Sequence, residues 1–256
     1  MSRPIFSLEG KVAIVTGASR GLGQAIAVAL AEAGADLFVT ARDVSSLDET
    51  RARVMARERK CHVAAQDVRD LSSIAATVAS CREKLGRIDI LVNNAGFEHV
   101  SPSVDVNESL WDAIVDTNLK GAFFWSQAVA RAISEQGGGG SIVNLCSLTS
   151  FVGIPTAVPY TSSKSGLLGM TRALAAEWAA SGIRVNAIAP GYFRTAMTED
   201  FYQDAAWQDR MISKIPQRRF GKDEDIGGAV VFLCSEASAY VTGHCIPVDG
   251  GFLASI

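Results

Sequence analysis

Hydrophobic positions along the chain fall into seven short runs, most of them rich in β-branched residues and separated by longer amphipathic stretches. The runs cover residues 12–16, 37–40, 62–65, 88–92, 141–146, 184–188 and 246–248. Between most of them, apolar residues recur at the three- and four-residue spacing of a helix. Strands that alternate with helices predict a parallel sheet with helices on both faces. We therefore expect residues 1–256 to form one α/β domain with a doubly wound, seven-stranded Rossmann fold.

Two segments depart from this alternation. Residues 137–140 are four consecutive glycines between a long predicted helix and the next strand, where they are expected to end the helix rather than to separate domains. Residues 192–221 show no strand pattern and are rich in Met, Phe, Tyr and Trp. We expect this segment to form a helical flap over the active edge of the sheet.

A glycine-rich turn follows the first predicted strand and leads into a helix that is expected to begin near Leu22. Residues 16–23 read Thr-Gly-Ala-Ser-Arg-Gly-Leu-Gly. In this position Gly17 permits a tight turn, Gly21 lets the backbone approach a pyrophosphate, and Gly23 allows the helix and strand to pack closely. Phosphates would then lie at the positive end of the helix, which predicts a dinucleotide site.

Tyr160 and Lys164 lie four residues apart in a segment with helical periodicity, so both side chains should project from one helix face. An ammonium beside the phenol would favour the phenolate and lower the tyrosine pKa from its usual value of about 10. Ser147, at the end of a predicted strand, could orient a carbonyl next to the tyrosine. A Tyr-x-x-x-Lys pair also arises by chance, so the catalytic interpretation of this pair depends on the surrounding motifs.

Composition argues against several other classes of protein. The formal net charge is −3 and the Lys and Arg residues are scattered, which disfavours nucleic-acid binding. No signal-like or membrane-spanning apolar segment is present, so we expect a cytoplasmic protein. The five cysteines show neither metal-ligand nor disulfide spacing and are interpreted as buried small residues. His62, His99 and His244 are far apart in the sequence, and no metal is expected.

Taken together, these motifs resemble those of the classical short-chain dehydrogenase/reductases, over essentially the whole chain. The motifs that follow the family order are the glycine turn, residues 93–96 (Asn-Asn-Ala-Gly), Asn118, Ser147, Tyr160, Lys164, Pro190, Gly191 and Thr195. The resemblance implies an NAD(P)-dependent enzyme that interconverts a secondary alcohol and a ketone. Around residues 189–195 and 219–221 the chain is most similar to the bacterial gluconate and deoxygluconate dehydrogenase branch.

Residue roles follow from this resemblance. It implies that Tyr160 is the acid/base, that Ser147 orients the carbonyl, and that Lys164 also binds the nicotinamide ribose. Asn118 would complete a tetrad on a locally distorted helix that holds a relay water, whereas Asn93 would be structural. The implied cofactor contacts are Gly17, Ser19, Arg20, Gly21, Leu22, Gly23, Arg42, Asp67, Val68, Asn94, Ala95, Gly96, Tyr160, Lys164, Pro190, Gly191, Phe193 and Thr195.

The end of the second predicted strand bears on the choice of nicotinamide. An enzyme for NAD would be expected to carry an acidic residue there, but this chain has Ala41 followed by Arg42. Arg42, with Arg20 as a second cation, could bind a 2′-phosphate. One charge-assisted bond of about 1.5 to 3 kcal/mol would favour NADP roughly tenfold to a hundredfold. We therefore expect NADP(H), while Asp43 beside Arg42 keeps NAD(H) as an alternative.

The expected substrate contacts are Glu98, His99, Thr149 and Tyr192, whose polarity favours a sugar acid, polyol or ketose over a fatty acyl chain. Glu98 and His99 could instead be solvated loop residues. One alternative function is 3-oxoacyl-[acyl-carrier-protein] reductase, which would need a basic patch such as Arg131, Arg172, Arg218 and Arg219. Another is a catalytically silent dinucleotide-binding sensor, against which the intact catalytic set argues.

Self-association is also implied by the resemblance. The predicted helices at 108–134 and 160–180 resemble those of the four-helix dimer interface in the family. Leu168, Ala175 and Trp178 could serve that contact or face the core instead. Residues 248–252 match a family ending that contacts another subunit, so a homotetramer is expected.

Overall fold

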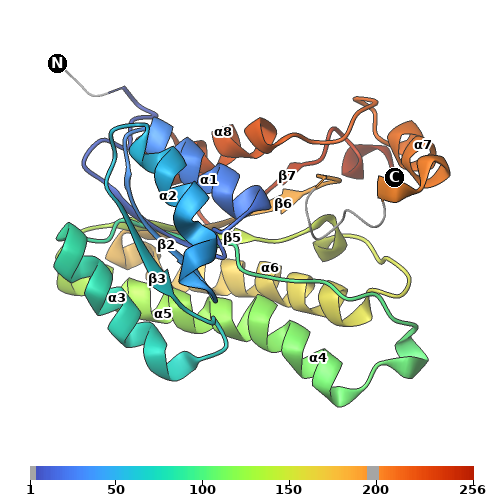
Figure 1. Ribbon diagram of the computed structural model, residues 1–256, viewed down its shortest axis with the longest axis horizontal. Coiled ribbons are helices and arrows are strands. Elements are labelled where there is room, and N and C mark those ends of the chain that lie inside the picture. The colour runs from blue at the N-terminus through green and yellow to red at the C-terminus, as the bar shows by residue number, and fades with distance from the viewer. Residues whose placement is uncertain (1–3, 195–201) are drawn as a thin grey trace.

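The computed structural model describes residues 4–194 and 202–256, which form a seven-stranded parallel sheet with the strand order β3-β2-β1-β4-β5-β6-β7 (Figure 1). Each predicted run falls on one of its strands, so the expected doubly wound fold is confirmed. The strands are β1 (Val12–Thr16), β2 (Asp36–Ala41), β3 (Cys61–Ala65), β4 (Ile90–Asn93), β5 (Gly140–Leu145), β6 (Ile183–Pro190) and β7 (Cys245–Val248).

Helices cover both faces of the sheet (Figure 1). On one face lie α1 (Gly21–Glu32), α2 (Asp48–Met55) and α8 (Asp223–Cys234). On the other lie α3 (Leu71–Leu85), α4 (Glu108–Val115), α5 (Gly121–Glu135) and α6 (Val158–Trp178), while α7 (Ala205–Lys214) belongs to the expected flap. Short 3₁₀ turns are η1 (Val44–Leu47), η2 (Ser103–Asp105), η4 (Leu148–Ser150), η5 (Ala179–Ser181), η7 (Glu236–Ser238) and η8 (Leu253–Ser255).

The hydrophobic core forms two layers, one on each face of the sheet. All five residues of β1 are buried, as expected for a central strand covered on both sides. Ile26 and Val230 belong to the layer under α1 and α8, and Trp125 and Val78 to the layer under α3 and α5. Each such side chain contributes about 1.5 to 3 kcal/mol through burial, so the two layers hold the ends of the central strands in fixed positions.

The predicted long helix at 108–134 is interrupted by a π-helical turn, η3 (Asp116–Lys120), between α4 and α5. Asn118 lies in this turn with 1% of its surface exposed, so the expected local distortion at Asn118 is present. Gly121 is the first residue of α5 and has no room for a side chain, because a Cβ at this position would lie 2.7 Å from the carbonyl oxygen of Val68. The turn therefore directs the Asn118 side chain inward.

The structure decides between the two roles left open for the apolar residues of α6. Leu168 and Ala175 are only 5% and 2% exposed, because this face of the helix packs on the sheet. They belong to the core and are unavailable to a partner subunit. Trp178 is partly buried against the same core. The sequence periodicity shows that α6 has an apolar face but does not show what covers it.

Other features of the described chain concern membranes, metals and thiols. None of its helices is long and apolar enough to cross a membrane. Within residues 4–194 and 202–256, His, Cys, Asp and Glu side chains form no group of three or more that could hold a metal ion. All five cysteines are free thiols, four of them buried as expected and Cys245 half-buried.

Candidate active site

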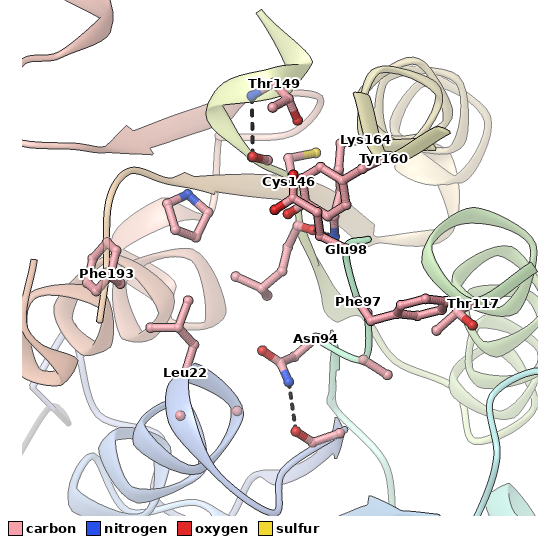
Figure 2. Close-up of a pocket in the computed structure, with 18 of the residues that line it drawn as sticks. Leu22, Asn94, Phe97, Glu98, Thr117, Cys146, Thr149, Tyr160, Lys164 and Phe193 are labelled. Carbon is pink, nitrogen blue, oxygen red and sulfur yellow. Dashed lines mark hydrogen bonds between the residues drawn. The ribbon is translucent and has the colours of Figure 1, made fainter. Parts of the chain in front are cut away.

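A cavity of about 800 Å³ opens at the carboxyl ends of the parallel strands (Figure 2). Its walls include residues that follow five of the strands: Gly17 after β1, Arg42 after β2, Asn94 after β4, Cys146 after β5 and Gly191 after β6. Ligands of doubly wound folds bind outside these strand ends. The cavity therefore has the position expected of the active site.

The glycine-rich turn forms one wall of the cavity, and its glycines are required sterically. Gly17 has φ +65°, and a Cβ there would lie 2.8 Å from the Cα of Ala95. A Cβ on Gly23 would collide with the Gly17 carbonyl oxygen and the Asn94 side chain. Helix α1 begins at Gly21, and no side chain caps its first turn. Its uncapped N–H groups and positive helix end fit the pyrophosphate of a dinucleotide.

Two cations stand at the side of the cavity nearest β2. Arg20 and Arg42 are exposed and line the cavity, and neither guanidinium forms a hydrogen bond or ion pair with the described residues. Asp43 does not line the cavity. Its carboxylate instead accepts hydrogen bonds from the Ser45 amide at 3.0 Å and the Ser45 hydroxyl at 2.8 Å. Both guanidinium groups therefore remain available to an anion such as a 2′-phosphate.

A third guanidinium in this region was not foreseen from the sequence. Arg69 lines the cavity and pairs with Asp67 at 2.6 Å. The Arg69 hydrogen bond holds the pKa of Asp67 below its usual range, although burial opposes this shift. Asp67, expected at the adenine ring, therefore reaches the cavity as a paired carboxylate. In the sequence, the feature that could have identified Arg69 as a cavity residue is its position two residues after Asp67.

Tyr160 and Lys164 lie on the first turns of α6, and Ser147 follows β5. The Lys164 Nζ lies 5.6 Å from the centroid of the Tyr160 ring and donates a hydrogen bond to the Leu145 carbonyl at 2.6 Å. The Ser147 hydroxyl interacts with the Tyr160 phenol and accepts a bond from the Thr149 amide at 3.3 Å. The structure thus brings the three expected catalytic side chains together in the cavity lining, where Figure 2 shows Tyr160 beside Lys164.

The predicted direction of the tyrosine pKa shift is wrong for this arrangement. Burial raises the pKa of Tyr160 above its usual value, the negative charge of Glu98 adds to this, and the Ser147 hydrogen bond only partly opposes it. Burial also lowers the pKa of Lys164 to about 8. The desolvation of a phenolate outweighs the attraction of an ammonium group that is bonded to a carbonyl. Tyr160 therefore holds its proton at neutral pH.

Asn118 acts behind the cavity wall and does not line it. Its Oδ1 accepts a hydrogen bond from the Phe97 amide at 3.0 Å, and its Nδ2 donates to the Ser163 hydroxyl at 3.1 Å. Ser163 in turn donates to the Tyr160 carbonyl at 2.7 Å. Asn118 therefore connects the loop after β4 to the helical turn that carries Tyr160.

The neighbouring asparagines have separate structural partners. Asn94 Nδ2 donates to the carbonyls of Thr16 at 3.0 Å and Gly17 at 2.9 Å, which holds the glycine turn against β4. Asn93 Nδ2 donates to Asn144 Oδ1 at 2.9 Å and links β4 to β5. Asn94 therefore supports the cofactor wall, while Asn93 supports the sheet.

The substrate end receives three of the four expected side chains. Glu98, Thr149 and Tyr192 line the cavity, whereas His99 is exposed and lies outside it, so that expectation is wrong. Neighbouring residues in an irregular segment point in different directions, and of Glu98 and His99 only Glu98 lines the cavity. The Thr149 hydroxyl is buried and has no hydrogen-bond partner among the described residues. Burial raises the pKa of Glu98, although Lys164 partly offsets this.

The described part of the expected flap adds aromatic rings to this end. Tyr202 and Trp207 line the cavity, and Tyr192 meets Trp207 edge to face with 5.8 Å between ring centroids. The sequence feature that indicated a role for Tyr202 and Trp207 is the aromatic composition of residues 192–221. Thr195, expected at the nicotinamide carboxamide, lies outside the described residues. Further lining residues that the sequence did not single out are Gln66, Val100, Thr117, Ile154, Pro155 and Thr156.

The remaining expected cofactor contacts also line the cavity. These residues are Ser19, Leu22, Val68, Ala95, Gly96, Pro190, Gly191 and Phe193. They come from segments far apart in the sequence, which the sheet brings to one edge. Gly96 is also close-packed, since a Cβ there would lie 3.0 Å from Asn118 Oδ1.

Comparison with known proteins agrees with this geometry. A family model described as enoyl-(acyl carrier protein) reductase matches residues 17–253. The chain is 44% identical over 249 residues to 2-dehydro-3-deoxy-D-gluconate 5-dehydrogenase of Dickeya dadantii (strain 3937), covering 97% of this chain and 98% of that protein. The chain belongs to the short-chain dehydrogenase/reductase family. This dehydrogenase/reductase is therefore an oxidoreductase that acts on CH–OH and carbonyl groups.

Solved structures show the same relationship. A candidate short-chain alcohol dehydrogenase from Sinorhizobium meliloti 1021 is 68% identical to this dehydrogenase/reductase, with a TM-score of 0.96 and coverage of 99% of this chain and 100% of that one. Gluconate 5-dehydrogenase from Burkholderia cenocepacia J2315, crystallised with NADP and tartrate, is 35% identical, with a TM-score of 0.94 and coverage of 98% of both chains. The family and fold inferred from the sequence motifs are thereby confirmed.

Proposed function

We propose that this chain is an NADP(H)-dependent dehydrogenase/reductase for small polyhydroxylated substrates, a class that includes sugar acids, polyols and ketoses. The observation that carries the proposal is the meeting of Ser147, Tyr160 and Lys164 in a cavity whose opposite wall is the glycine-rich turn. One end of the cavity suits a dinucleotide, and the other presents a proton donor to a carbonyl.

Each catalytic side chain has a distinct task in this proposal. When bound, the nicotinamide supplies or accepts the hydride. Tyr160 holds its proton in the buried site and gives it to the carbonyl oxygen during reduction, or takes it back during oxidation. Ser147 orients that oxygen by hydrogen bonding, and the charge of Lys164 offsets negative charge that develops on it. Asn118 is a positioning residue, because it acts through Phe97 and Ser163.

Support for NADP(H) comes from the cations at the cavity. Arg20 and Arg42 line it without partners among the described residues, and Asp43 is engaged with Ser45. The relative from Burkholderia cenocepacia was crystallised with NADP. The alternative in which Asp43 binds the ribose hydroxyls of NAD is weaker, since Asp43 does not line the cavity.

Support for a polar substrate comes from the lining of the catalytic end, where Glu98, Thr149 and Tyr192 accompany the catalytic residues. The alternative of an acyl-carrier-protein substrate needs available basic residues. Arg219 is paired with Asp225 at 2.6 Å, and Arg218 donates to the Ser213 carbonyl at 2.7 Å. Two of the four arginines that could bind an acidic carrier are therefore engaged within the chain.

The experiment measures NADPH and NADH consumption by the purified protein with keto-sugar acids, ketoses and 3-oxoacyl thioesters, with Tyr160→Phe as the control. NADPH-linked turnover of the polar ketones that is lost in the variant supports the proposal. Preference for acyl thioesters would favour the carrier-protein reductase. Cofactor binding without turnover of any substrate would favour the silent sensor.

We also propose that residues 1–256 form one domain with residues 192–221 as a flap, and that the chain assembles as a cytoplasmic homotetramer. The outward positions of α6 include the small residues Ser165, Gly169, Ala173 and Ala176, which would allow close approach of another helix. The free thiols suit a reducing compartment. Light scattering should give the mass of four 27.1 kDa chains, and a monomer mass would contradict this assembly.

A further inference from the structure

We propose that Glu98 selects a neutral, hydroxyl-bearing substrate and disfavours sugar acids, which carry a carboxylate. This inference rests on the proposed function and narrows its substrate class. It also separates this chain from relatives whose names specify gluconate derivatives, because gluconate is an anion. Four observations on the cavity support it.

The first observation is that Glu98 is an unpartnered carboxylate in the catalytic end of the cavity. Its side chain lines the cavity and is half-buried, and it forms no hydrogen bond or ion pair with the described residues. Figure 2 shows Glu98 in the same part of the cavity as Cys146, Tyr160 and Lys164. An ionised carboxylate only accepts hydrogen bonds, so a ligand that displaces water from Glu98 must supply a donor.

The second observation is that Glu98 is electrostatically coupled to the reacting groups. Its charge acts on Tyr160, Lys164 and Tyr192, and Lys164 acts on Glu98 in return. A substrate whose carbonyl carbon lies beside Tyr160 must therefore place its neighbouring groups within the field of this carboxylate. A hydroxyl gains a charge-assisted hydrogen bond there, whereas a carboxylate is repelled.

The third observation is the distribution of cations around the cavity. Among the described lining residues, the cations are Arg20, Arg42, Arg69 and Lys164. The three arginines follow β1, β2 and β3, and none of them acts electrostatically on Glu98, whereas Lys164 does. Lys164, the cation of the catalytic end, bonds to the Leu145 carbonyl. A substrate carboxylate would therefore meet Glu98 without a guanidinium beside it.

Residues next to the cavity add no cation to its described lining near Glu98. Arg194 is exposed, lies over the Tyr202 ring at 5.9 Å from its centroid, and does not line the cavity. Residues 195–201 lie outside the described chain, and their sequence contains no Lys or Arg.

The fourth observation is a second polar group that lacks a partner. Thr149 lines the cavity, is 3% exposed, and its hydroxyl has no hydrogen-bond partner among the described residues. Buried polar groups are normally hydrogen-bonded, so a ligand hydroxyl is a suitable partner. Glu98 and Thr149 together match a ligand with several hydroxyls.

The test uses the protein with NADP⁺ and two substrates that differ only at C1. D-glucitol carries a neutral hydroxymethyl group where D-gluconate carries a carboxylate. We expect kcat/KM for glucitol to exceed that for gluconate by about tenfold or more, the effect of one charge-assisted bond. In Glu98→Gln the ratio of the glucitol value to the gluconate value should fall by about tenfold or more, and any change in the Tyr160 pKa cancels from this ratio. Equal values in the unaltered protein, or an unchanged ratio in the variant, would overturn the proposal.

A binding measurement keeps the test independent of turnover. Tartrate and threitol form a second matched pair, and their affinities for the NADP⁺ complex can be measured by calorimetry. Tartrate should bind about tenfold more tightly to Glu98→Gln than to the unaltered protein, while threitol should not gain affinity. Equal tartrate affinity in both would refute charge selection, whereas absence of turnover with any ketone would refute the proposed function instead.

Asp105→Asn is the matched control for lost charge. Asp105 lies on the same connection between β4 and α4, is exposed, and does not line the cavity. Its substitution should leave both substrate ratios unchanged. If it shifts them as Glu98→Gln does, a general change in net charge explains the effect and the proposal fails.

Discussion

Asn118 holds both backbone groups of Phe97: its Oδ1 accepts from the Phe97 amide and its Nδ2 donates to the Phe97 carbonyl, each at 3.0 Å. This pair of bonds fixes the segment after β4, which carries Glu98 into the cavity. A π-helical turn supplies the geometry, since Asn118 lies within it and is buried. The irregular turn therefore has a structural role in the site.

Asn118→Ala should reduce both stability and activity. It leaves the Phe97 amide and carbonyl without these partners, which costs about 1 to 3 kcal/mol of unfolding free energy, and it loosens the loop that carries Glu98. We expect kcat to fall by about tenfold or more. Denaturant unfolding and steady-state kinetics provide the measurements.

Asn107→Ala is the control for this substitution. Asn107 caps α4 by accepting a bond from the Leu110 amide at 2.9 Å and lies outside the cavity lining. Loss of this cap should cost about 1 kcal/mol of stability while leaving kcat unchanged. An equal fall of kcat in both variants would mean that lost stability, not the Phe97 contact, explains the result.

Arg42→Ala should weaken NADPH specifically. Arg42 faces the cavity without a partner, so its loss removes a charge-assisted bond to a 2′-phosphate and should raise the KM for NADPH about tenfold to a hundredfold. The KM for NADH should stay within about twofold, because NADH lacks that phosphate. Arg51→Ala, at an exposed position outside the cavity, should change neither value. An equal rise in the KM values for NADPH and NADH in Arg42→Ala would contradict the role of Arg42.

Gly23→Ala should abolish tight cofactor binding. The added methyl group would collide with backbone and with Asn94, so the glycine turn must shift at a cost of about 1 to 3 kcal/mol. The matched control is Gly228→Ala in α8, where the new Cβ would meet no atom within 4 Å apart from those of its own helical backbone and chain neighbours. That variant should gain about 0.5 to 1 kcal/mol of stability and bind NADPH normally. Unchanged NADPH affinity in Gly23→Ala, measured by fluorescence titration, would disprove the assigned role of the turn.

Glu98→Gln should move the pH profile of alcohol oxidation to lower pH. Oxidation needs a phenol that has lost its proton, and the Glu98 charge raises the pKa of Tyr160. Removing that charge lowers this pKa, so the rising limb of kcat/KM should appear at lower pH than in the unaltered protein. Ketone reduction needs the protonated phenol, and its falling limb should move in the same direction. A shift toward higher pH, or none, would contradict the coupling.

The sequence predicted the framework well for a physical reason. Strands buried on both faces must be almost entirely apolar, so runs such as 12–16 are visible without a structure. The glycine turn is equally visible, because backbone approach at Gly17 and Gly23 excludes any side chain. Residues that follow different strands then reach one edge by topology alone.

Contacts between segments were much harder to predict. The sequence periodicity predicted an apolar face on α6, but it could not show that Leu168 and Ala175 pack within the same chain. The inward and outward directions of Glu98 and His99 depend on an irregular segment that has no repeating pattern. The pKa of Tyr160 depends on burial and on Glu98, neither of which follows from the spacing of Tyr160 and Lys164.

The measurement that tests the central claim most directly compares the unaltered protein with Tyr160→Phe. NADPH affinity is measured by fluorescence, and ketone reduction by NADPH consumption with the best substrate of the panel. Since the phenol supplies the proton while the cofactor wall is untouched, we predict unchanged NADPH affinity and a fall in kcat of at least about a hundredfold. Reduction at the unaltered rate in Tyr160→Phe, with NADPH still bound, would contradict the account.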